Sequence, residues 1–196
     1  DLRKTRFSKC NLSGANLITV RWLNSLISKS NLSNSHLIRA NLKDARFSIC
    51  NFQHSLFTAA SAQNASFWGG DFTGADLSRS NFANANLRRT KLNGVQLIRT
   101  NLTAVDLHKA DLTDALIQDT DFDTNTILPD GSNWSPERNL AEFGAETREI
   151  ISRNSQRDEG SVQKIQMYTF ADGITRRWQL GKGWLDDKDG NPIGED

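Results

Sequence analysis

The residues of this 196-residue chain best suited to chemistry are three histidines and two cysteines. They are His36, His54, His108, Cys10 and Cys50. A zinc site would need several such side chains converging on one point. No CxxC, HExxH, Walker or GxSxG pattern occurs. The spacing of these residues therefore predicts neither a metal site nor a known nucleophile motif.

Two short acidic motifs are the remaining candidates for chemistry. Asp106 and His108 flank Leu107 and would lie on one surface. A carboxylate–imidazole pair can activate a nucleophile, but no nucleophile accompanies these two residues. Residues 187–191 are similar to the start of a calcium-binding loop, but Pro192 stands where that loop requires glycine. We therefore assign no catalytic, cofactor-binding or metal-binding residue, and we expect that the protein is not an enzyme.

These histidines and cysteines lie within a sequence repeat. Large apolar residues recur at every fifth position. The series runs without an insertion from Leu2 to Ile127, and only Ala62 is small. A second series of small residues lies two positions before the large ones. Asn or Asp commonly stands between the two, as in residues 15–17, Ala-Asn-Leu. A period of five fits neither an α-helix nor a β-strand.

The repeat resembles the A(D/N)LXX motif of the pentapeptide-repeat family over residues 1–127. This resemblance implies an all-β solenoid, a right-handed quadrilateral β-helix in which four pentapeptides form one coil and about six coils stack. Backbones stacked about 4.8 Å apart satisfy one another's hydrogen bonds, and alternating large and small inward side chains fill a narrow core. We expect seven large residues to define that core: Leu37, Phe52, Phe57, Phe67, Phe72, Leu77 and Phe82.

The coil gives the cysteines and histidines structural positions. Cys10 and Cys50 both occupy small inward positions on one side, two coils apart. Their separation should be about 10 Å, beyond the reach of a disulfide. The three histidines fall on three different sides and cannot share a metal ion.

Outward residues form rows, because residues twenty apart stack on the same side of such a coil. One row carries Lys9, Lys29, Ile49, Gly69, Arg89 and Lys109, and the row on the opposite side carries Thr19, Arg39, Ala59, Arg79, Arg99 and Asp119. Basic charge is therefore confined largely to two opposite sides.

These two sides are the predicted partner-binding surfaces. The second also has outward aliphatic residues beside its arginines, which are typical of a contact surface, although scattered apolar residues are also normal on protein surfaces. Its predicted contact residues are Ile18, Ile38, Arg39, Arg79, Ile98 and Arg99. The first side is a second candidate, through Trp68, Arg88, Arg89, His108 and Lys109.

The repeat is predicted to end at residues 128–131, Leu-Pro-Asp-Gly, and Trp134 is placed to cover the last coil. Similar endings close the coil in many family members, especially bacterial ones. Proline cannot continue a ladder of backbone hydrogen bonds, and glycine permits a turn. The predicted domains are therefore a β-helix over 1–131 and a C-terminal region over 132–196.

The C-terminal region is predicted to contain a helix and a β-hairpin. Residues 135–137, Ser-Pro-Glu, are typical of a helix start, and the helix should run to about Ser155. Strands are expected at 162–170 and 174–185, joined by a turn at Asp172-Gly173. This region would either cap the coil or form a small α+β appendage.

The tail also resembles the end of a PAS sensory domain. The N-terminal part of such a domain, which would complete a ligand pocket, has no counterpart here, so no cofactor is predicted. The matching residues are Asp172, Gly173, Arg177, Trp178, Gly183, Asp187, Asp189, Gly190, Asn191 and Gly194.

Charge distinguishes the candidate functions. Residues 1–130 hold 15 Lys and Arg against 11 Asp and Glu, a net +4. The fluoroquinolone-resistance branch of the family resembles B-form DNA, inhibits DNA gyrase and is strongly acidic, so this charge has the wrong sign for a DNA mimic. The sequence favours a non-catalytic protein–protein interaction or scaffold module within a longer regulatory protein. The alternatives are gyrase inhibition, direct nucleic-acid binding, or a sensory fragment with a PAS-like tail.

Two further expectations concern the setting of the protein. No run approaches the roughly 18 apolar residues that span a bilayer, and no signal peptide is visible. We therefore expect a cytoplasmic location, and the sequence leaves a homodimer open.

Overall fold

The computed structural model describes residues 1–135, 138, 140–148, 165–169, 175–179 and 183–184. The chain divides into two compact units, Asp1–Glu146 and Thr147–Asp196. The first unit therefore contains the repeat and also the residues that follow the predicted boundary at 131.

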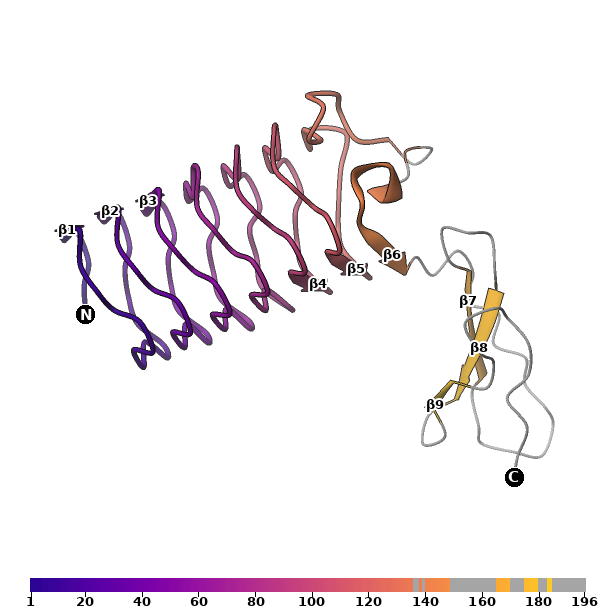
Figure 1. Ribbon diagram of the computed structural model, residues 1–196, viewed down its shortest axis with the longest axis horizontal. Coiled ribbons are helices and arrows are strands. Elements are labelled where there is room, and N and C mark those ends of the chain that lie inside the picture. Colours follow the sequence, from indigo (N-terminus) through magenta and orange to yellow (C-terminus); the bar gives the residue numbers. More distant parts are fainter. Residues whose placement is uncertain (136–137, 139, 149–164, 170–174, 180–182, 185–196) are drawn as a thin grey trace. The chain divides into compact units, whose positions relative to one another are not determined.

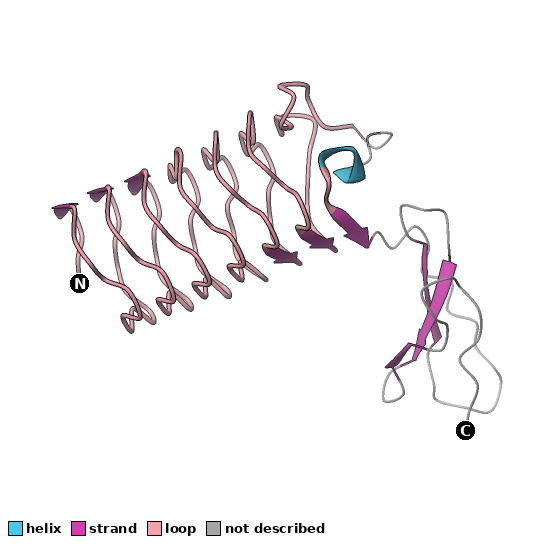
Figure 2. Cartoon of the chain, in the orientation of Figure 1, coloured by secondary structure: helices cyan, strands magenta, loops and turns pink. Residues whose placement is uncertain are grey.

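The first unit is a parallel coil whose successive turns pair at an offset of twenty residues (Figure 1). Strands β1 (Arg6–Ser8), β2 (Leu26–Ser28) and β3 (Arg46–Ser48) form one parallel sheet at this offset. Strands β4 (Gln96–Ile98) and β5 (Leu116–Gln118) pair in the same way. Isolated bridges join the remaining sides, so most of the coil is drawn as loop in Figure 2. Twenty residues of a five-residue repeat give four sides per coil.

Each side ends in a corner, at the second residue after the large one, where φ is positive. Lys29 and Arg39, for example, have φ values of 47° and 55°. Such a conformation costs a non-glycine residue roughly 1–2 kcal/mol. The next coil holds the corner in place: the Lys29 N–H donates to the Ser48 carbonyl at 2.9 Å, and the Arg39 N–H donates to that of Thr58 at 3.0 Å. Because the backbone is satisfied between coils, the corner side chain can face solvent.

The interior is an aromatic and aliphatic ladder. All seven large residues predicted to define the core are fully buried. Phe52 stacks on Phe72 with ring centroids 4.8 Å apart, and Phe47 stacks on Phe67 at 5.1 Å. Edge-to-face contacts join neighbouring sides, such as Phe52 and Phe57 at 5.3 Å. Rings thus meet both along and across the coil.

The period of five slips by one residue in the last coil, so the prediction that it continues unbroken to Ile127 is wrong. Asp106 pairs with Ile127, an offset of 21. Thr126 and Leu128 are fully buried, one position later than the pattern predicts, while Ile127 is only half-buried.

An aspartate side chain explains the extra residue. In the preceding coil the corner N–H of Asn84 donates to the carbonyl of Thr103 at 2.9 Å. The equivalent N–H of Ala104 donates instead to a carboxylate oxygen of Asp123 at 2.8 Å, and this bond lowers the pKa of Asp123. The carboxylate replaces a backbone carbonyl, which allows the chain to bulge.

The residues after the coil pack against its end. Trp134 stacks on Phe122 with ring centroids 5.9 Å apart. Leu140, in the 3-10 helix η1 (Leu140–Phe143), is buried in the same core as the coil. These contacts explain why the first compact unit extends past the repeat.

In the described residues, the helix predicted from Ser135 is replaced by the short η1 and a strand. Gly144, with φ of +79°, follows η1, and its carbonyl accepts a hydrogen bond from the Asp114 N–H at 2.8 Å. Strand β6 (Glu146–Arg148) then joins β4 and β5 in one sheet. Pairing with the last coil therefore overrides the helix signal, and the predicted helix beyond Arg148 lies outside the described residues.

The second unit contains an antiparallel sheet of β7 (Ile165–Thr169), β8 (Thr175–Gln179) and β9 (Gly183–Trp184), in that order. The pairing of β7 with β8 agrees with the predicted hairpin, but the single strand predicted at 174–185 is wrong, because β8 and β9 are two strands that pair with each other antiparallel. The predicted turn at Asp172-Gly173 and the PAS-like residues of 187–194 lie outside the described residues.

Candidate interaction surface

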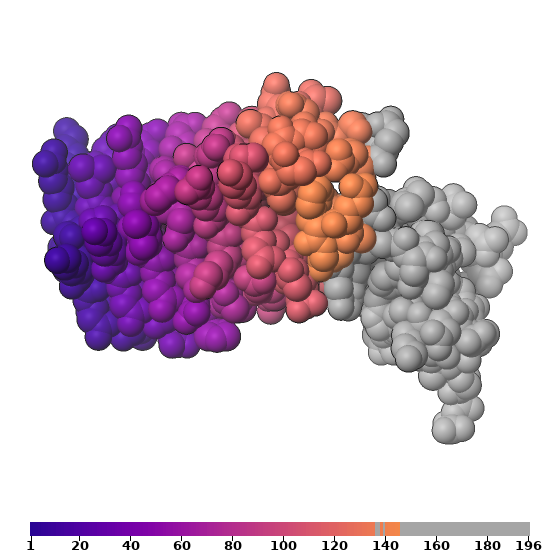
Figure 3. Space-filling model, turned by 45° about the horizontal axis from the view of Figure 1, so that its top comes forward, coloured from indigo at the N-terminus to yellow at the C-terminus, as the bar shows by residue number. Residues whose placement is uncertain are grey.

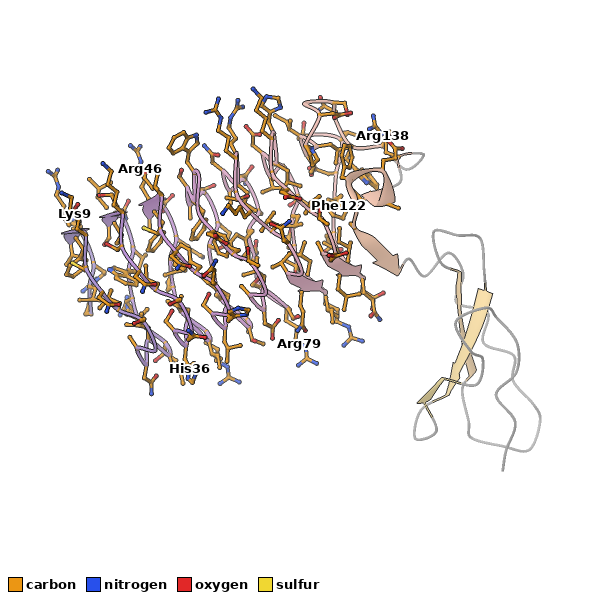
Figure 4. The ribbon with its side chains drawn as sticks, in the orientation of Figure 1. Lys9, His36, Arg46, Arg79, Phe122 and Arg138 are labelled. Carbon is orange, nitrogen blue, oxygen red and sulfur yellow. The ribbon has the colours of Figure 1, made fainter. Side chains whose placement is uncertain are left out.

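The coil has four sides, and two opposite ones carry most of its basic residues. In Figure 4, Lys9 and Arg46 project from one edge of the coil, and His36 and Arg79 project from the opposite edge. Figure 3 shows the stacked coils as a continuous surface. We define the Lys9 side by the outward residues around the inward Phe7, Ile27, Phe47, Phe67, Leu87 and Leu107, and the Arg79 side by those around the inward Leu17, Leu37, Phe57, Leu77, Leu97 and Ile117.

The exposure of an outward residue depends on its place within the repeat. The residue directly after the large one lies between equivalent residues of the coils on either side, whereas the corner residue projects. Ile38 and Ile98 are accordingly half-buried, while their corner neighbours Arg39 and Arg99 are exposed. Ile18 is 43% exposed because only one neighbouring coil covers it. The exposed apolar surface predicted for the Arg79 side is therefore reduced to one isoleucine.

The Arg79 side is also nearly neutral. Its cations are Arg39, Arg79 and Arg99, and its acids are Asp76 and Asp119, a net +1. Arg99 forms an ion pair with Asp119 at 3.6 Å. This side therefore has two arginines without a paired acid among the described residues.

The Lys9 side is strongly cationic. Over the six coils that define it, this side has seven cations against the single acid Asp106, a net +6, and Arg88 pairs with Asp106 at 3.0 Å. None of the other six cations forms an ion pair in the described part of the chain. The seven are Arg6, Lys9, Lys29, Arg46, Arg88, Arg89 and Lys109.

The Lys9 side also holds most of the exposed apolar surface. Four large apolar side chains are exposed in the described residues, and three of them, Leu26, Ile49 and Trp68, lie on this side, at 40%, 50% and 37% exposure. The Ile49 N–H donates to the Trp68 carbonyl at 3.0 Å, so these two residues lie on adjacent coils. Gly69 follows Ile49 in the corner row and leaves one flank of the isoleucine open. We call Ile49 and Trp68 the apolar centre.

Ile49 is poorly suited to its position as a structural residue. It is a corner residue with φ of 54° and is β-branched, a combination it shares only with Thr19 among the described residues. Such a residue costs roughly 1–3 kcal/mol in this conformation, and its 50% exposure removes about half of the gain from burial. Because neither property helps the coil, we expect Ile49 to contribute at a contact with another molecule.

Sequence reasoning overlooked Leu26 and gave Ile49 no special role. The available signal was positional, since corner residues are the most exposed of each repeat. An isoleucine in the corner row is therefore a stronger indication of a contact surface than the isoleucines at 18, 38 and 98.

The histidines of the coil do not converge on one site. His36, His54 and His108 lie on three different sides, and the described residues contain no cluster of three or more His, Cys, Asp or Glu that could hold a metal ion. Cys10 and Cys50 are free thiols, and burial raises the pKa of Cys50. Within the described part of the chain, no helix is long and apolar enough to cross a membrane.

The solved structures that match this chain share little sequence with it. Rfr23, a pentapeptide repeat protein from the cyanobacterium Cyanothece 51142, is 20% identical, with coverage of 65% of this chain and 86% of that one and a TM-score of 0.36. A trypsin-treated variant of QnrB1, a plasmid-mediated fluoroquinolone resistance protein, is 20% identical, with coverages of 74% and 83% and a TM-score of 0.38. The pentapeptide repeat protein alr5209 from Nostoc PCC 7120 is 22% identical, with coverages of 60% and 84% and a TM-score of 0.39.

The family model described as "Pentapeptide repeats (8 copies)" matches residues 24–53, 40–79 and 80–119. No curated protein sequence matches the chain. The matched residues are those in which backbone pairing at an offset of twenty and the five-residue alternation of burial are both continuous. Through this coil, the chain belongs to the pentapeptide-repeat family.

Proposed function

We propose that the coil is a non-catalytic docking module that binds a protein partner through the Lys9 side. The inter-coil hydrogen bonds leave the backbone of this side already paired, so a partner would be recognised by side chains. Binding a partner to the side-chain rows of this side should cost little backbone conformational entropy, because the backbone of the coil is already ordered.

The observation that carries this proposal is the apolar centre, Ile49 and Trp68, lying among unpaired cations. Exposed apolar patches with a polar rim mark interaction sites. Tryptophan and arginine are enriched among the residues that dominate binding energy. The Arg79 side has one exposed isoleucine and a net +1, so it is the weaker candidate despite its row of arginines.

Site-specific photo-crosslinking in cells tests which side binds. Ser48 lies next to Ile49 on the Lys9 side, and Ser78 occupies the matched position beside Arg79; both are half-buried. A photoreactive amino acid at Ser48 should crosslink a specific partner that is absent from the Ser78 sample and is lost when Ile49→Asp is added. Equal crosslinking from both positions, or crosslinking from Ser78 alone, would contradict the proposal.

The DNA-mimic alternative is not favoured by the charge of this surface. QnrB1 is described as a plasmid-mediated fluoroquinolone resistance protein. A mimic of the DNA backbone needs a dense negative surface, whereas the Lys9 side carries a net +6. We expect DNA gyrase supercoiling to be unchanged at micromolar concentrations of this protein.

A further inference from the structure

We infer that the Lys9 side binds an extended acidic peptide segment that has acidic residues at both ends and an apolar residue between them. This inference rests on the proposed docking function and specifies the chemistry of the partner. The segment would run along the coil axis, crossing about six coils.

The order of residues in the corner row gives the pattern. Two cations come first, then the exposed Ile49 and the open position at Gly69, and then two more cations. Trp68 lies directly beside this middle part. Over the first six coils the row is Lys9, Lys29, Ile49, Gly69, Arg89 and Lys109; in the last coil the equivalent corner residue is Asp130, which is paired with Arg138 at 3.0 Å. A complementary ligand would be negative, apolar and negative again along its length.

The spacing of the coils gives the length of the segment. Adjacent coils lie about 4.8 Å apart, and the Phe52 and Phe72 rings stack at 4.8 Å. The inner cations Lys29 and Arg89 are three coils apart, or about 14 Å, and the outer cations are five coils apart, or about 24 Å. An extended peptide rises about 3.3 Å per residue. The inner pair therefore corresponds to about four residues and the whole row to about seven or eight.

The other edge of the same side repeats the alternation. Arg6, Leu26 and Arg46 follow one another there on successive coils, and the central leucine is 40% exposed. Aliphatic side chains between cations give a protein segment apolar contacts in addition to charge pairs.

A nucleic acid fits this arrangement less well. Its phosphates form a continuous negative track, and proteins follow that track with continuous rows of cations. Here the corner row is interrupted at Ile49 and Gly69. Trp68 could stack on a base, as aromatic residues do in single-strand binding proteins, so an oligonucleotide is the competing ligand that the test must include.

Binding of synthetic peptides to the intact chain tests the inference. The probe is a fluorescein-labelled eight-residue peptide with two glutamates at each end and a central Gly-Leu-Leu-Gly, measured by fluorescence anisotropy. The controls are a peptide of the same composition with its four glutamates contiguous at one end, and a single-stranded thymidine octanucleotide. We expect the patterned peptide to bind at least about tenfold more tightly than either control, a difference of about 1.4 kcal/mol.

Paired variants locate the binding site. Lys29→Glu with Arg89→Glu reverses the inner cations, and Arg39→Glu with Arg79→Glu is the matched change in the corner row of the Arg79 side. All four positions are exposed and none forms an ion pair in the described residues. The first pair should weaken the patterned peptide at least about tenfold, as several exposed charge contacts are lost together. The second pair should change its affinity less than about twofold, because surface charges beyond a Debye length are screened.

The outcomes separate the two proposals. If the peptide with contiguous glutamates binds as tightly as the patterned one, or the oligonucleotide binds more tightly than both peptides, the inferred partner chemistry is wrong. A specific crosslink from Ser48 would still support protein docking in the first case. If neither peptide binds and Ser48 captures no partner, both the inferred chemistry and the docking function fail.

Discussion

Replacing Phe52 by alanine tests how the coil is held together. Phe52 is fully buried and stacks on Phe72 at 4.8 Å. It also meets the rings of Phe47 at 5.5 Å, Phe57 at 5.3 Å and Phe67 at 5.8 Å. Removing a fully buried phenylalanine costs about 3–5 kcal/mol through lost burial and the cavity it leaves. Because Phe52 contributes to aromatic pairs worth about 0.5–1.5 kcal/mol each, we expect a value near the upper end.

The coil geometry supplies a matched control. Phe7 has the same place in the repeat but lies in the first coil, where it is half-buried and its ring contact is Trp22 at 6.1 Å. Phe7→Ala should cost less than about 2 kcal/mol, since much of that side chain remains in water.

Urea unfolding followed by tryptophan fluorescence and far-ultraviolet circular dichroism measures both variants. In a solenoid each coil is stabilised by its neighbours, so Phe52→Ala also weakens the coupling between the coils that precede Phe52 and those that follow it. We expect a lower midpoint and a broader or two-step transition. A loss below about 1.5 kcal/mol, or equal losses for Phe52→Ala and Phe7→Ala, would refute the idea that the central aromatic ladder is the main source of stability.

Other parts of the coil give three more predictions. Gly70→Ala should lower the free energy of unfolding by about 1–3 kcal/mol, because its methyl group would stand 3.0 Å from a backbone oxygen and 3.3 Å from a phenylalanine ring; calorimetry showing no loss would contradict this packing. The hydroxyl and N–H of Ser132 hold the pKa of Asp130 at about 2, below the ordinary 3.8. The stability from this carboxylate should therefore be complete above pH 3.8 and lost as the pH falls toward 2. Asp130→Asn should make the free energy of unfolding less dependent on pH in that window. Because burial raises the pKa of Cys50 while Cys10 is half-buried, a thiol reagent should modify Cys10 in the native protein and Cys50 only after unfolding; two equally fast thiols would exclude this arrangement.

The core could be predicted from the sequence because the repeat fixes which residues face inward. Each large residue is held by equivalent residues twenty positions away, so local composition and tertiary packing point to the same answer. The slip at the last coil could not be found this way. Ile127 and Leu128 are both large and apolar, and the choice between them depends on the carboxylate of Asp123, which replaces a backbone carbonyl.

The C-terminal end was harder to predict because local and tertiary preferences conflict there. Residues 135–137 carry a helix-start signal, but strand pairing and the burial of Leu140 favour a short 3-10 helix followed by β6. The interaction surface was difficult for a related reason. An isoleucine at 38 and one at 49 are both outward, and only the stacking of coils shows that the first is half-buried and the second exposed.

The most direct measurement of the docking claim is the affinity of the partner crosslinked from Ser48 for two isoleucine variants. Ile49→Asp changes the apolar centre, and Ile18→Asp changes the one exposed isoleucine of the Arg79 side. Isothermal titration calorimetry should show a loss of about a hundredfold for Ile49→Asp, as expected for a central contact residue worth about 2.8 kcal/mol. Ile18→Asp should remain within about twofold of the parent protein, a change too small for a contact residue. The opposite ranking, or equal affinities for both variants, would contradict docking through the Lys9 side.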